Sequence, residues 1–336
     1  MFYSIGLDIS KKLIAVHIPM NNQDIEIEND INSIKSLYSK LKKLYKKNIG
    51  NLVFIFEPTG SYSFTLTKFC SEKDIKCFLI NPKQFSNFSK ALGQRNKSDL
   101  VDAKVLSQAL AIAKENEIKV PIIDNIIEEI KELISYYKFI TKNTTKQICH
   151  LESIKVKGGN RYMIEDLKKS IKSSKKKELE ILAKIKAIIK GNIELENSFN
   201  NIKSITGIGE LGAIVLLHLF KKYPKANKKQ ICSLAGLDPI EKTSGTSIQK
   251  RAKISKAGSR IYRGTLFLGV LTAIRYDQNF KIYFERLKAK GKHTTCAQIA
   301  VMRKMIVIAH SLYKNDTIYN KEFYRTTYSN QEIKCS

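Results

Sequence analysis

The amino terminus alternates large apolar residues with small or polar ones. Residues 4–18 contain two short apolar stretches separated by a basic turn, which predicts two strands joined as a hairpin. One face of the first strand is apolar, whereas the other carries Ser4, Gly6 and Asp8. A carboxylate in such a strand is costly unless it has a partner or holds a cation. The small neighbours leave room beside Asp8 for another group. Asp8 is therefore either a hairpin-turn residue or a ligand.

The next hundred residues switch between strand-like and helical periodicity. Strands are predicted at residues 24–28, 52–56 and 76–80, and helices at residues 31–47, 61–72 and 99–112. The strand at 52–56 is apolar throughout, as expected of a strand buried on both faces. It stops at Glu57-Pro58, and Asn81-Pro82 breaks the chain after the next strand. We therefore predict an α/β domain over residues 1–122, a mixed sheet with flanking helices.

The remainder of the chain has mainly helical periodicity. Residues 126–199 space Ile and Leu three and four apart, interrupted only at 157–160. This predicts an antiparallel, coiled-coil-like helical hairpin that serves as a linker over residues 123–200. An all-α domain follows over residues 201–315, and residues 316–336 form a polar tail that we expect to be peripheral or frayed. Within this domain we predict helices near 228–234, 259–276 and 294–313, a loop at 236–245, and a helix-hairpin-helix-like element at 205–213.

The net charge of the chain indicates which class of molecule it binds. The 336 residues include 59 Lys and Arg against 31 Asp and Glu, a formal net charge of +28. Such a field favours polyanions, either nucleic acid or an anionic membrane surface. Coding bias in an AT-rich genome explains many lysines but not the shortage of carboxylates, so we favour nucleic acid. Every apolar run is far shorter than the ~20 residues of a membrane span, so no membrane partner is expected.

Cysteine usage and the amino terminus bear on location. The six cysteines and five histidines are scattered, without the spacing of a zinc site. The first nine residues lack the basic region of a signal peptide and already contain Asp8. We therefore expect a cytoplasmic protein with reduced thiols, acting at the nucleoid.

Four carboxylates, considered together, suggest a metal site. Asp8 lies in the first strand, Glu57 ends a buried strand, and Asp99 and Asp102 share one face of a helix's first turn. Taken alone, the last two are explained as helix caps, with Asp99 as N-cap and Asp102 at the third helical position. In a ribonuclease-H-like sheet, however, the two strands are neighbours and a following helix crosses their ends. Four converging carboxylates repel one another unless divalent cations lie between them. We favour Mg²⁺, with two ions about 4 Å apart acting on a phosphodiester.

Two sets of short motifs flank the predicted helical hairpin. The first set is Gly6-Leu7-Asp8-Ile9, Phe56-Glu57-Pro58-Thr59-Gly60-Ser61-Tyr62, Asn81-Pro82 and Lys97-Ser98-Asp99-Leu100-Val101-Asp102-Ala103. The second set is Ala235-Gly236-Leu237-Asp238-Pro239, Thr243-Ser244-Gly245 and Ile254-Ser255-Lys256-Ala257-Gly258-Ser259-Arg260. In this order they resemble the DEDD transposases, the insertion-sequence "one-ten" family that includes the Piv invertase. The resemblance spans residues 4–313. Ser98 stands where threonine is frequent in the family, and the terminal tail has no counterpart.

This resemblance implies a RuvC-like nuclease domain, a coiled-coil linker and a helical transposase domain. It implies that the four acids hold Mg²⁺ and that Ser244 is the nucleophile that links to a DNA phosphate. Read from the residues alone, Ser244 is a turn serine. Five other hydroxyl residues are about as eligible: Thr243, Thr246, Ser247, Ser255 and Ser259. The resemblance further implies donor and target DNA, a structured guide RNA (the bridge RNA) encoded by the element, and homo-oligomers, both dimers and tetramers. In the tetramers, one protomer's acidic site is completed by another's serine loop.

Contacts with nucleic acid are predicted at two kinds of position. Gly207 and Gly209 would let backbone N–H groups approach a phosphate at the start of a helix. The basic residues near the acidic helix and the serine loop would bind the backbone: Lys97, Lys250, Arg251, Lys253, Lys256 and Arg260.

Three functions are compatible with these features. We favour a DNA transposase or recombinase that cleaves and rejoins strands with a serine nucleophile in a Mg²⁺-dependent reaction. A RuvC-like structure-specific nuclease would instead use metal-bound water, and Ser244 would be incidental. A non-catalytic nucleic-acid-binding scaffold would use the four acids only as caps and turns.

Overall fold

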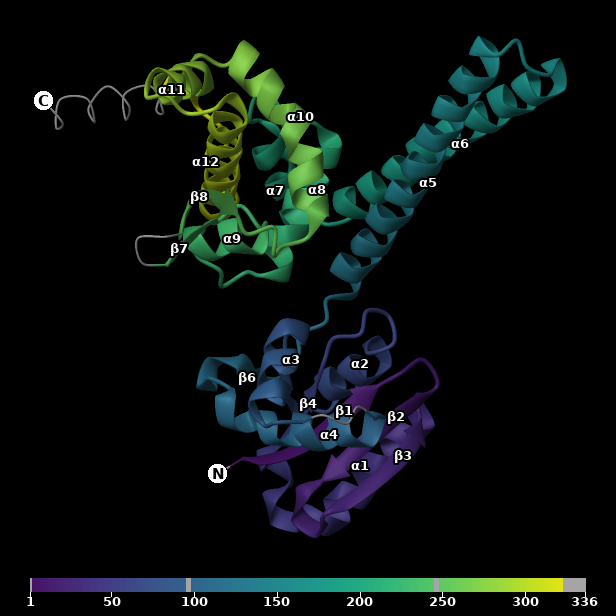
Figure 1. Cartoon of the computed structure of the whole chain (residues 1–336), viewed down its shortest axis with the longest axis vertical. Helices are drawn as coiled ribbons and strands as arrows, with labels where there is room; N and C mark the ends of the chain where they lie inside the picture. The colour runs from purple at the N-terminus through teal and green to yellow at the C-terminus, as the bar shows by residue number, and fades with distance from the viewer. Residues whose placement is uncertain (1, 95–97, 245–247, 323–336) are drawn as a thin grey trace, which may run out of the picture. The chain divides into compact units, whose positions relative to one another are not determined.

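The computed structural model describes residues 2–94, 98–244 and 248–322, and in the stretch 242–252 it describes the backbone only. The chain divides into two compact units, an N-terminal unit of residues 1–124 and a C-terminal unit of residues 125–336 (Figure 1). Each unit has hydrophobic core residues of its own, so each can be understood from its own packing.

A six-stranded mixed sheet forms the centre of the N-terminal unit, in the order β3-β2-β1-β4-β5-β6. Its strands are β1 (Tyr3–Ile9), β2 (Leu13–Ile18), β3 (Gln23–Glu28), β4 (Leu52–Phe56), β5 (Lys76–Leu79) and β6 (Ile118–Lys119). β1, β4 and β5 are parallel, and the other pairings are antiparallel. The predicted hairpin, third strand and mixed sheet are therefore confirmed, and the arrangement is consistent with an RNase H-like fold.

Helices cover both faces of this sheet. On one face, α1 (Ile31–Tyr45) and α2 (Phe64–Glu72) pack against Phe54, Phe56 and the apolar side of β1. On the other face, α3 (Pro82–Ala91) and α4 (Asp99–Gln108) pack against Val53 and Ile55. Successive residues of a strand point to opposite faces, which explains why the apolar run of β4 serves both cores.

The helix α3 was not predicted. Proline at position 82 was interpreted as a break, but here it occupies the first helical position, where it needs no intrahelical N–H bond. Asn81 is the N-cap, and its side-chain oxygen accepts a hydrogen bond from the Lys83 N–H at 2.9 Å. The Asn-Pro pair therefore starts a helix instead of only ending a strand.

Glycine 6 is the point where α4 lies directly on the sheet. A Cβ atom at Gly6 would stand 1.9 Å from the Ala103 carbonyl oxygen and 2.5 Å from the Ser107 nitrogen. No side chain fits between these backbones, so the sequence needs glycine at this position. The room predicted beside Asp8 is thus occupied by a helix.

The C-terminal unit is mainly helical. Its helices are α5 (Asn125–Val156), α6 (Arg161–Lys190), α7 (Ile193–Lys203), α8 (Glu210–Lys222), α9 (Lys228–Leu234), α10 (Arg260–Tyr276), α11 (Gln278–Ala289) and α12 (Thr294–Asn315). α5 and α6 form a long antiparallel pair that turns at residues 157–160, as predicted (Figure 1). Side chains cross-link the pair, since Thr144 Oγ1 donates to Glu178 Oε1 at 2.7 Å. The isoleucines at one end of the pair join the same core as α8 and α12.

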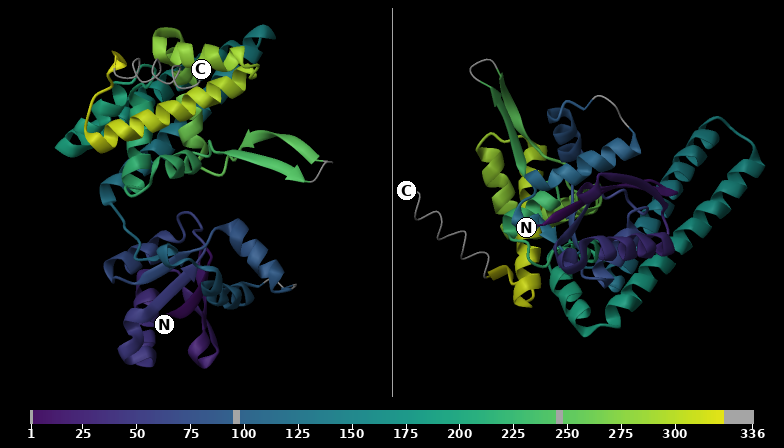
Figure 2. Two further views of the ribbon diagram at one scale, coloured as in Figure 1. Left: turned by 90° about the vertical axis from the view of Figure 1, so that its left-hand side faces the viewer. Right: turned by 90° about the horizontal axis from the view of Figure 1, so that it is seen from below.

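Two predictions about this unit were wrong. The helical hairpin has a second interruption at Gly191-Asn192, where α6 ends and Asn192 caps α7 through a 3.1 Å bond from the Leu195 N–H. The predicted loop at 236–245 is mostly a strand, β7 (Pro239–Ser244), which pairs antiparallel with β8 (Ile248–Ile254). This two-stranded hairpin projects away from the helices of its unit (Figure 2).

The first residues of the predicted tail are packed instead of frayed. Tyr319 is 8% exposed and stacks on Phe280 with ring centroids 6.2 Å apart. Its backbone N–H donates to Ser204 Oγ at 2.8 Å, and Asn201 Nδ2 donates to Asp316 Oδ1 at 2.7 Å. Residues 323–336 lie outside the described residues, and the domain boundaries set from the sequence stay predictions.

The sequence analysis also expects that no segment spans a membrane and that the cysteines are reduced. In the parts of the chain that the structure describes, each helix is too short or too polar to cross a membrane. The five cysteines in those parts are free thiols, as predicted.

The close approach at Gly6 gives a test of the fold. We expect Gly6→Ala to lower the free energy of unfolding by about 1–3 kcal/mol, because α4 must move away from β1 to admit the methyl group. Chemical denaturation measures the loss. Gly50→Ala is the matched control, since a Cβ there meets no atom within 4 Å. Equal stabilities of the two variants would contradict the packing described.

Candidate active site

Two of the predicted acids, Asp8 and Glu57, lie at the carboxyl ends of the neighbouring parallel strands β1 and β4. Leu7 pairs with Phe56 in the parallel register of β1 and β4, and Asp8 and Glu57 are the next residues of each chain segment. Asp8 shares the face of β1 that carries Gly6, so it faces α4. Both carboxylates are half-buried. The carboxyl ends of neighbouring parallel strands are a usual location for ligand sites in α/β proteins.

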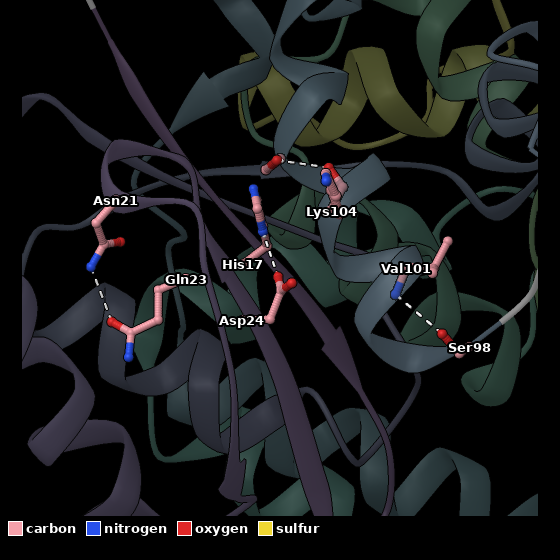
Figure 3. A network of polar contacts seen from close by, with 8 residues as sticks. His17, Asn21, Gln23, Asp24, Ser98, Val101 and Lys104 are labelled. Atoms are coloured by element: carbon pink, nitrogen blue, oxygen red, sulfur yellow. Dashed lines mark hydrogen bonds and ion pairs between the residues drawn. The ribbon is translucent and has the colours of Figure 1, made fainter.

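The other two acids come from the first turn of α4. Ser98 is the N-cap, and its hydroxyl accepts a 3.4 Å hydrogen bond from the Val101 N–H (Figure 3). Asp99 is therefore the first helical residue and Asp102 the fourth, so the capping roles considered for them from the sequence are wrong. Asp99 is exposed, whereas Asp102 is 9% exposed. Because α4 crosses β1 at Gly6, its first turn lies beside Asp8.

The pKa of Asp8 depends on the charges of the other three carboxylates. The pKa of Asp8 is raised from 3.8 to about 6, first by burial and then by the charges of Asp99, Asp102 and Glu57. A like charge raises the pKa of a carboxyl only when it is close, so the fold brings these four residues into one electrostatic neighbourhood. Three carboxylates that are distant along the chain thus act on Asp8, and their shared role as metal ligands stays a prediction.

The donor set suits a hard cation, although it is not a closed metal site. Within the described ranges, no three His, Cys, Asp or Glu side chains lie close enough together to hold one metal ion. The four side chains nevertheless offer only carboxylate oxygens, the ligands that Mg²⁺ prefers. A divalent cation among them would offset the repulsion that raises the pKa of Asp8. The residues therefore fit the predicted metal in ligand chemistry, and the metal site itself stays a prediction.

A buried histidine on the same sheet face was missed by the sequence analysis. His17 of β2 lies opposite Gly6 of β1 and opposite Asp24 of β3. It is 4% exposed, and its Nδ1 donates to Asp24 Oδ1 at 2.6 Å (Figure 3). The available signal was a histidine within an apolar strand, since such a residue needs a polar partner. The pair fastens the antiparallel edge of the sheet next to the acidic residues.

The predicted nucleophile belongs to the β7–β8 hairpin. Ser244 is the last residue of β7 and is paired in register with Ile248. Its backbone is therefore part of a strand and not of a loop. Its side chain and residues 245–247 lie outside the described residues, so its role stays a prediction.

Hydrogen bonds fasten the two ends of this hairpin to each other. Arg263 Nη1 donates to the carbonyl oxygens of Ala235, which precedes β7, and Gly258, which follows β8, each at 2.8 Å. The Ser255 N–H donates to the Asp238 carbonyl oxygen at 2.8 Å, and the Ser255 hydroxyl donates to the Asp238 carboxylate. A Cβ at Gly258 would lie 1.9 Å from the Leu234 carbonyl oxygen. These contacts hold the two ends of the hairpin together.

Arg263 was not predicted from the sequence. Its partners are backbone carbonyl groups, which the spacing of residues does not reveal.

The predicted phosphate-binding glycines have different surroundings. Gly207 has a φ of +91°, and a Cβ there would lie 2.2 Å from the Gly269 carbonyl oxygen of α10, so helix packing accounts for it. Gly209 is the N-cap of α8 and borders open space. Next to it, Glu210 is paired with Lys186 at 3.1 Å and Lys203 at 3.5 Å. A negative side chain therefore already occupies this helix start.

The predicted basic contacts are only partly described. Lys97 and the side chains of Lys250 and Arg251 lie outside the described residues. Lys253, Lys256 and Arg260 are exposed near the base of the hairpin. Arg260 also acts on Lys138 of α5, whose pKa is lowered to about 8 by burial and by the charge of Arg260. Lys138 is a basic neighbour that the sequence analysis missed, because α5 is distant in sequence.

Two family models match the chain. One, described as a transposase of the DEDD IS110 type, matches residues 5–154, which contain the carboxylate neighbourhood. The other, described as a transposase of the IS116/IS110/IS902 family, matches residues 199–285, which contain the hairpin. The two matches fall on the two regions that the sequence motifs had singled out.

Curated relatives agree with these models. The pilin gene-inverting proteins of Moraxella bovis and Moraxella lacunata are each 27% identical over 331 residues, covering 95% of this chain and 98% of each relative. An uncharacterized 43.6 kDa protein of insertion element IS110 from Streptomyces coelicolor is 30% identical over 121 residues, covering 35% of this chain and 29% of that protein. The chain belongs to the DEDD transposases of the IS110 family, which the sequence motifs had indicated.

Proposed function

We propose that this protein cleaves and rejoins DNA strands by a Mg²⁺-dependent transesterification in which Ser244 is the nucleophile. Membership of a transposase and DNA invertase family implies DNA recombination. The observation that carries the chemical proposal is the raised pKa of Asp8, caused in part by three other carboxylates. Such mutual repulsion is characteristic of a site that is completed by a cation.

The four carboxylates would hold the metal at the carboxyl edge of the sheet. Mg²⁺, when bound, supplies positive charge to the attacked phosphate and to the leaving oxygen. Asp8 and Glu57 come from strands, and Asp99 and Asp102 come from a helix that Gly6 allows to dock closely. This packing fixes the backbones of β1 and α4, from which the side chains would reach the ion.

The proposed covalent step conserves the number of phosphodiester bonds. The Ser244 hydroxyl attacks a DNA phosphorus, an Oγ–P bond forms, and a P–O bond to deoxyribose breaks. The serine proton leaves, and the departing deoxyribose oxygen takes up a proton. A hydroxyl of the partner strand then attacks the phosphoserine, which restores Ser244 and joins the new strands. No external energy source is required, because each step exchanges one ester for another.

The finer parts of the proposal rest on the family resemblance. They include the bridge RNA, the tetramer, a RuvC-like N-terminal domain, coiled-coil packing of α5 and α6, and a helix-hairpin-helix element at α7–α8. The net charge of +28 supports nucleic-acid partners in general. A protein whose target is chosen by base pairing needs to read mainly backbone, and diffuse positive charge suits that task.

The pKa of Asp8 predicts a stability change with pH. This pKa rises from 3.8 to about 6 on folding, so the folded protein binds more protons between pH 4 and 6, and stability falls as pH rises through that window. We therefore expect metal-free Asp8→Asn protein at pH 7.5 to be more stable than the wild type, by about 1–2 kcal/mol after allowance for solvent screening. Thermal melting with and without Mg²⁺, at pH 7.5 and pH 5, measures this effect.

The effect of Mg²⁺ on the melting temperature distinguishes a metal site from a carboxyl group that is merely buried. At pH 7.5 Mg²⁺ should raise the melting temperature of the wild type, and at pH 5 it should do so much less, because Asp8 is then mostly protonated. Asp8→Asn should lose the response and more than a hundredfold of the DNA-cleavage rate. The exposed Asp74 provides the control Asp74→Asn, which removes the same charge elsewhere in the unit. A wild type that ignores Mg²⁺ at both pH values would exclude the metal assignment.

The serine assignment predicts a covalent intermediate. With a nicked suicide DNA and the guide RNA, the wild type should form a protein–DNA adduct that survives SDS, detected by gel electrophoresis. Ser244→Ala should abolish it, whereas Thr243→Val and Ser247→Ala should retain it. Cleavage by Ser244→Ala without any adduct would instead favour the water-using nuclease. No cleavage by any variant, including the wild type, would favour the binding scaffold.

A further inference from the structure

A cavity lined by basic and other polar residues lies between α9 and the carboxyl-terminal end of α12 in the C-terminal unit. Its volume is about 610 Å³, within the usual range of ligand sites. α9 contributes Lys228 and Lys229 with the preceding Asn227, and α12 contributes His310, Ser311 and Lys314. α9 lies within residues 199–285 and α12 lies beyond them, so the transposase family match covers only one side of this cavity.

No residue in the described part of the chain forms a hydrogen bond with the side chain of His310, which lines this cavity. Its side chain is only 3% exposed, and Phe220 packs against the ring at a centroid distance of 5.2 Å. Among the described residues it donates to and accepts from none, and its remaining opening is the cavity that it lines. A buried imidazole retains a donor N–H that needs a partner. A ligand with acceptor oxygens would supply that partner.

The charges around His310 are all of one sign. Lys228 and Lys314 both lower its pKa, after the larger effect of burial. These two lysines and Lys229 form no ion pair or hydrogen bond within the part of the chain that the structure describes. Three ammonium groups from two helices therefore border one cavity, and the lining contains no Asp or Glu. Like charges held together in this way attract an anion.

We propose that this cavity binds the phosphodiester backbone of a nucleic acid strand, with His310 donating a hydrogen bond to a phosphate oxygen and Lys228, Lys229 and Lys314 neutralising its charge. The inference rests on the proposed function, which takes nucleic acid as substrate. The lining contains no Phe, Tyr or Trp on which a base stacks, so the cavity suits backbone and not bases. The contact is therefore independent of sequence, and it lies outside the chemistry of strand cleavage.

Lysine footprinting tests this proposal on the full-length protein. The protein is treated with an amine-acetylating reagent, alone and with a 40-base-pair DNA or a structured RNA, and mass spectrometry measures acetylation at each lysine. We expect nucleic acid to reduce acetylation of Lys228, Lys229 and Lys314 at least fivefold. Lys281 and Lys290 of the α11 region are exposed and do not line the cavity, so their acetylation should change little. A parallel sample with inorganic pyrophosphate separates a small anion from a strand.

A charge-removal pair gives an independent measurement. The double variant Lys228→Gln and Lys314→Gln should lower the slope of log affinity against log salt by about 1.8, because each lost phosphate contact removes about 0.9. The control double variant Lys281→Gln and Lys290→Gln removes the same charge and should leave that slope unchanged. His310→Gln, which retains an N–H donor, should weaken binding less than His310→Leu.

Each outcome decides between the alternatives. Equal protection of all five lysines, or equal salt slopes for the two double variants, would overturn the proposal. Protection by pyrophosphate that matches protection by DNA and RNA would also overturn it, in favour of a site for a small phosphate. The footprint does not depend on cleavage, so Asp8→Asn protein should give the same result. Failure of strand cleavage would therefore count against the proposed function alone.

Discussion

Helix α4 holds two carboxylates beside a third against their mutual repulsion. The opposite end of the helix offsets this cost, because Val105 and Leu106 are buried against the sheet. The first turn contributes as well, since negative side chains near a helix amino terminus are favoured by the helix dipole. Gly6 lets the backbone of α4 lie directly on β1, so the apolar side chains of the helix are buried and its first turn comes close to the sheet. Backbone packing of α4 on β1 therefore brings the acidic first turn of the helix toward Asp8.

The same device recurs in the C-terminal unit. Gly258 meets the Leu234 carbonyl oxygen, and Gly207 meets that of Gly269, so glycine again permits one backbone to rest on another. In the hairpin, Arg263 adds donors to carbonyl groups on both sides of the base. In both units, main-chain contacts therefore fix the position of the segment that carries predicted site residues, α4 in one and the β7–β8 hairpin in the other.

The sequence predicted most of the fold where periodicity was strong. The strands of the sheet and the turn at residues 157–160 were found, because apolar spacing and glycine signals are local. It missed α3, since Phe85 and Phe88 are too few apolar positions to establish a helical repeat. It missed α11 for the same lack of a clear apolar face, and it interpreted β7 as a loop because Gly236, Pro239 and Gly245 suggested one.

Asp8 could be singled out from the sequence because a carboxylate is out of place in an apolar strand, whereas Asp99 and Asp102 are ordinary residues at a helix start. How near they come to one another depends on the docking of α4, and that depends on three-dimensional packing. The wrong capping assignment arose because Ser98 and Asp99 are both good N-caps, and only the backbone decides between them. Arg263 and His310 were missed because their environments are built from distant segments.

The dependence of this site on α4 has a consequence for the DNA cleavage that we propose. Asp8 is made early in translation, whereas Asp99 and Asp102 emerge only as the first unit nears completion. Until the helix lies on the sheet, the chain holds scattered carboxylates with ordinary acidity. If the acidic residues act together as proposed, a nascent or partly unfolded copy would not cleave DNA, and completed folding of the first unit would be a condition for activity.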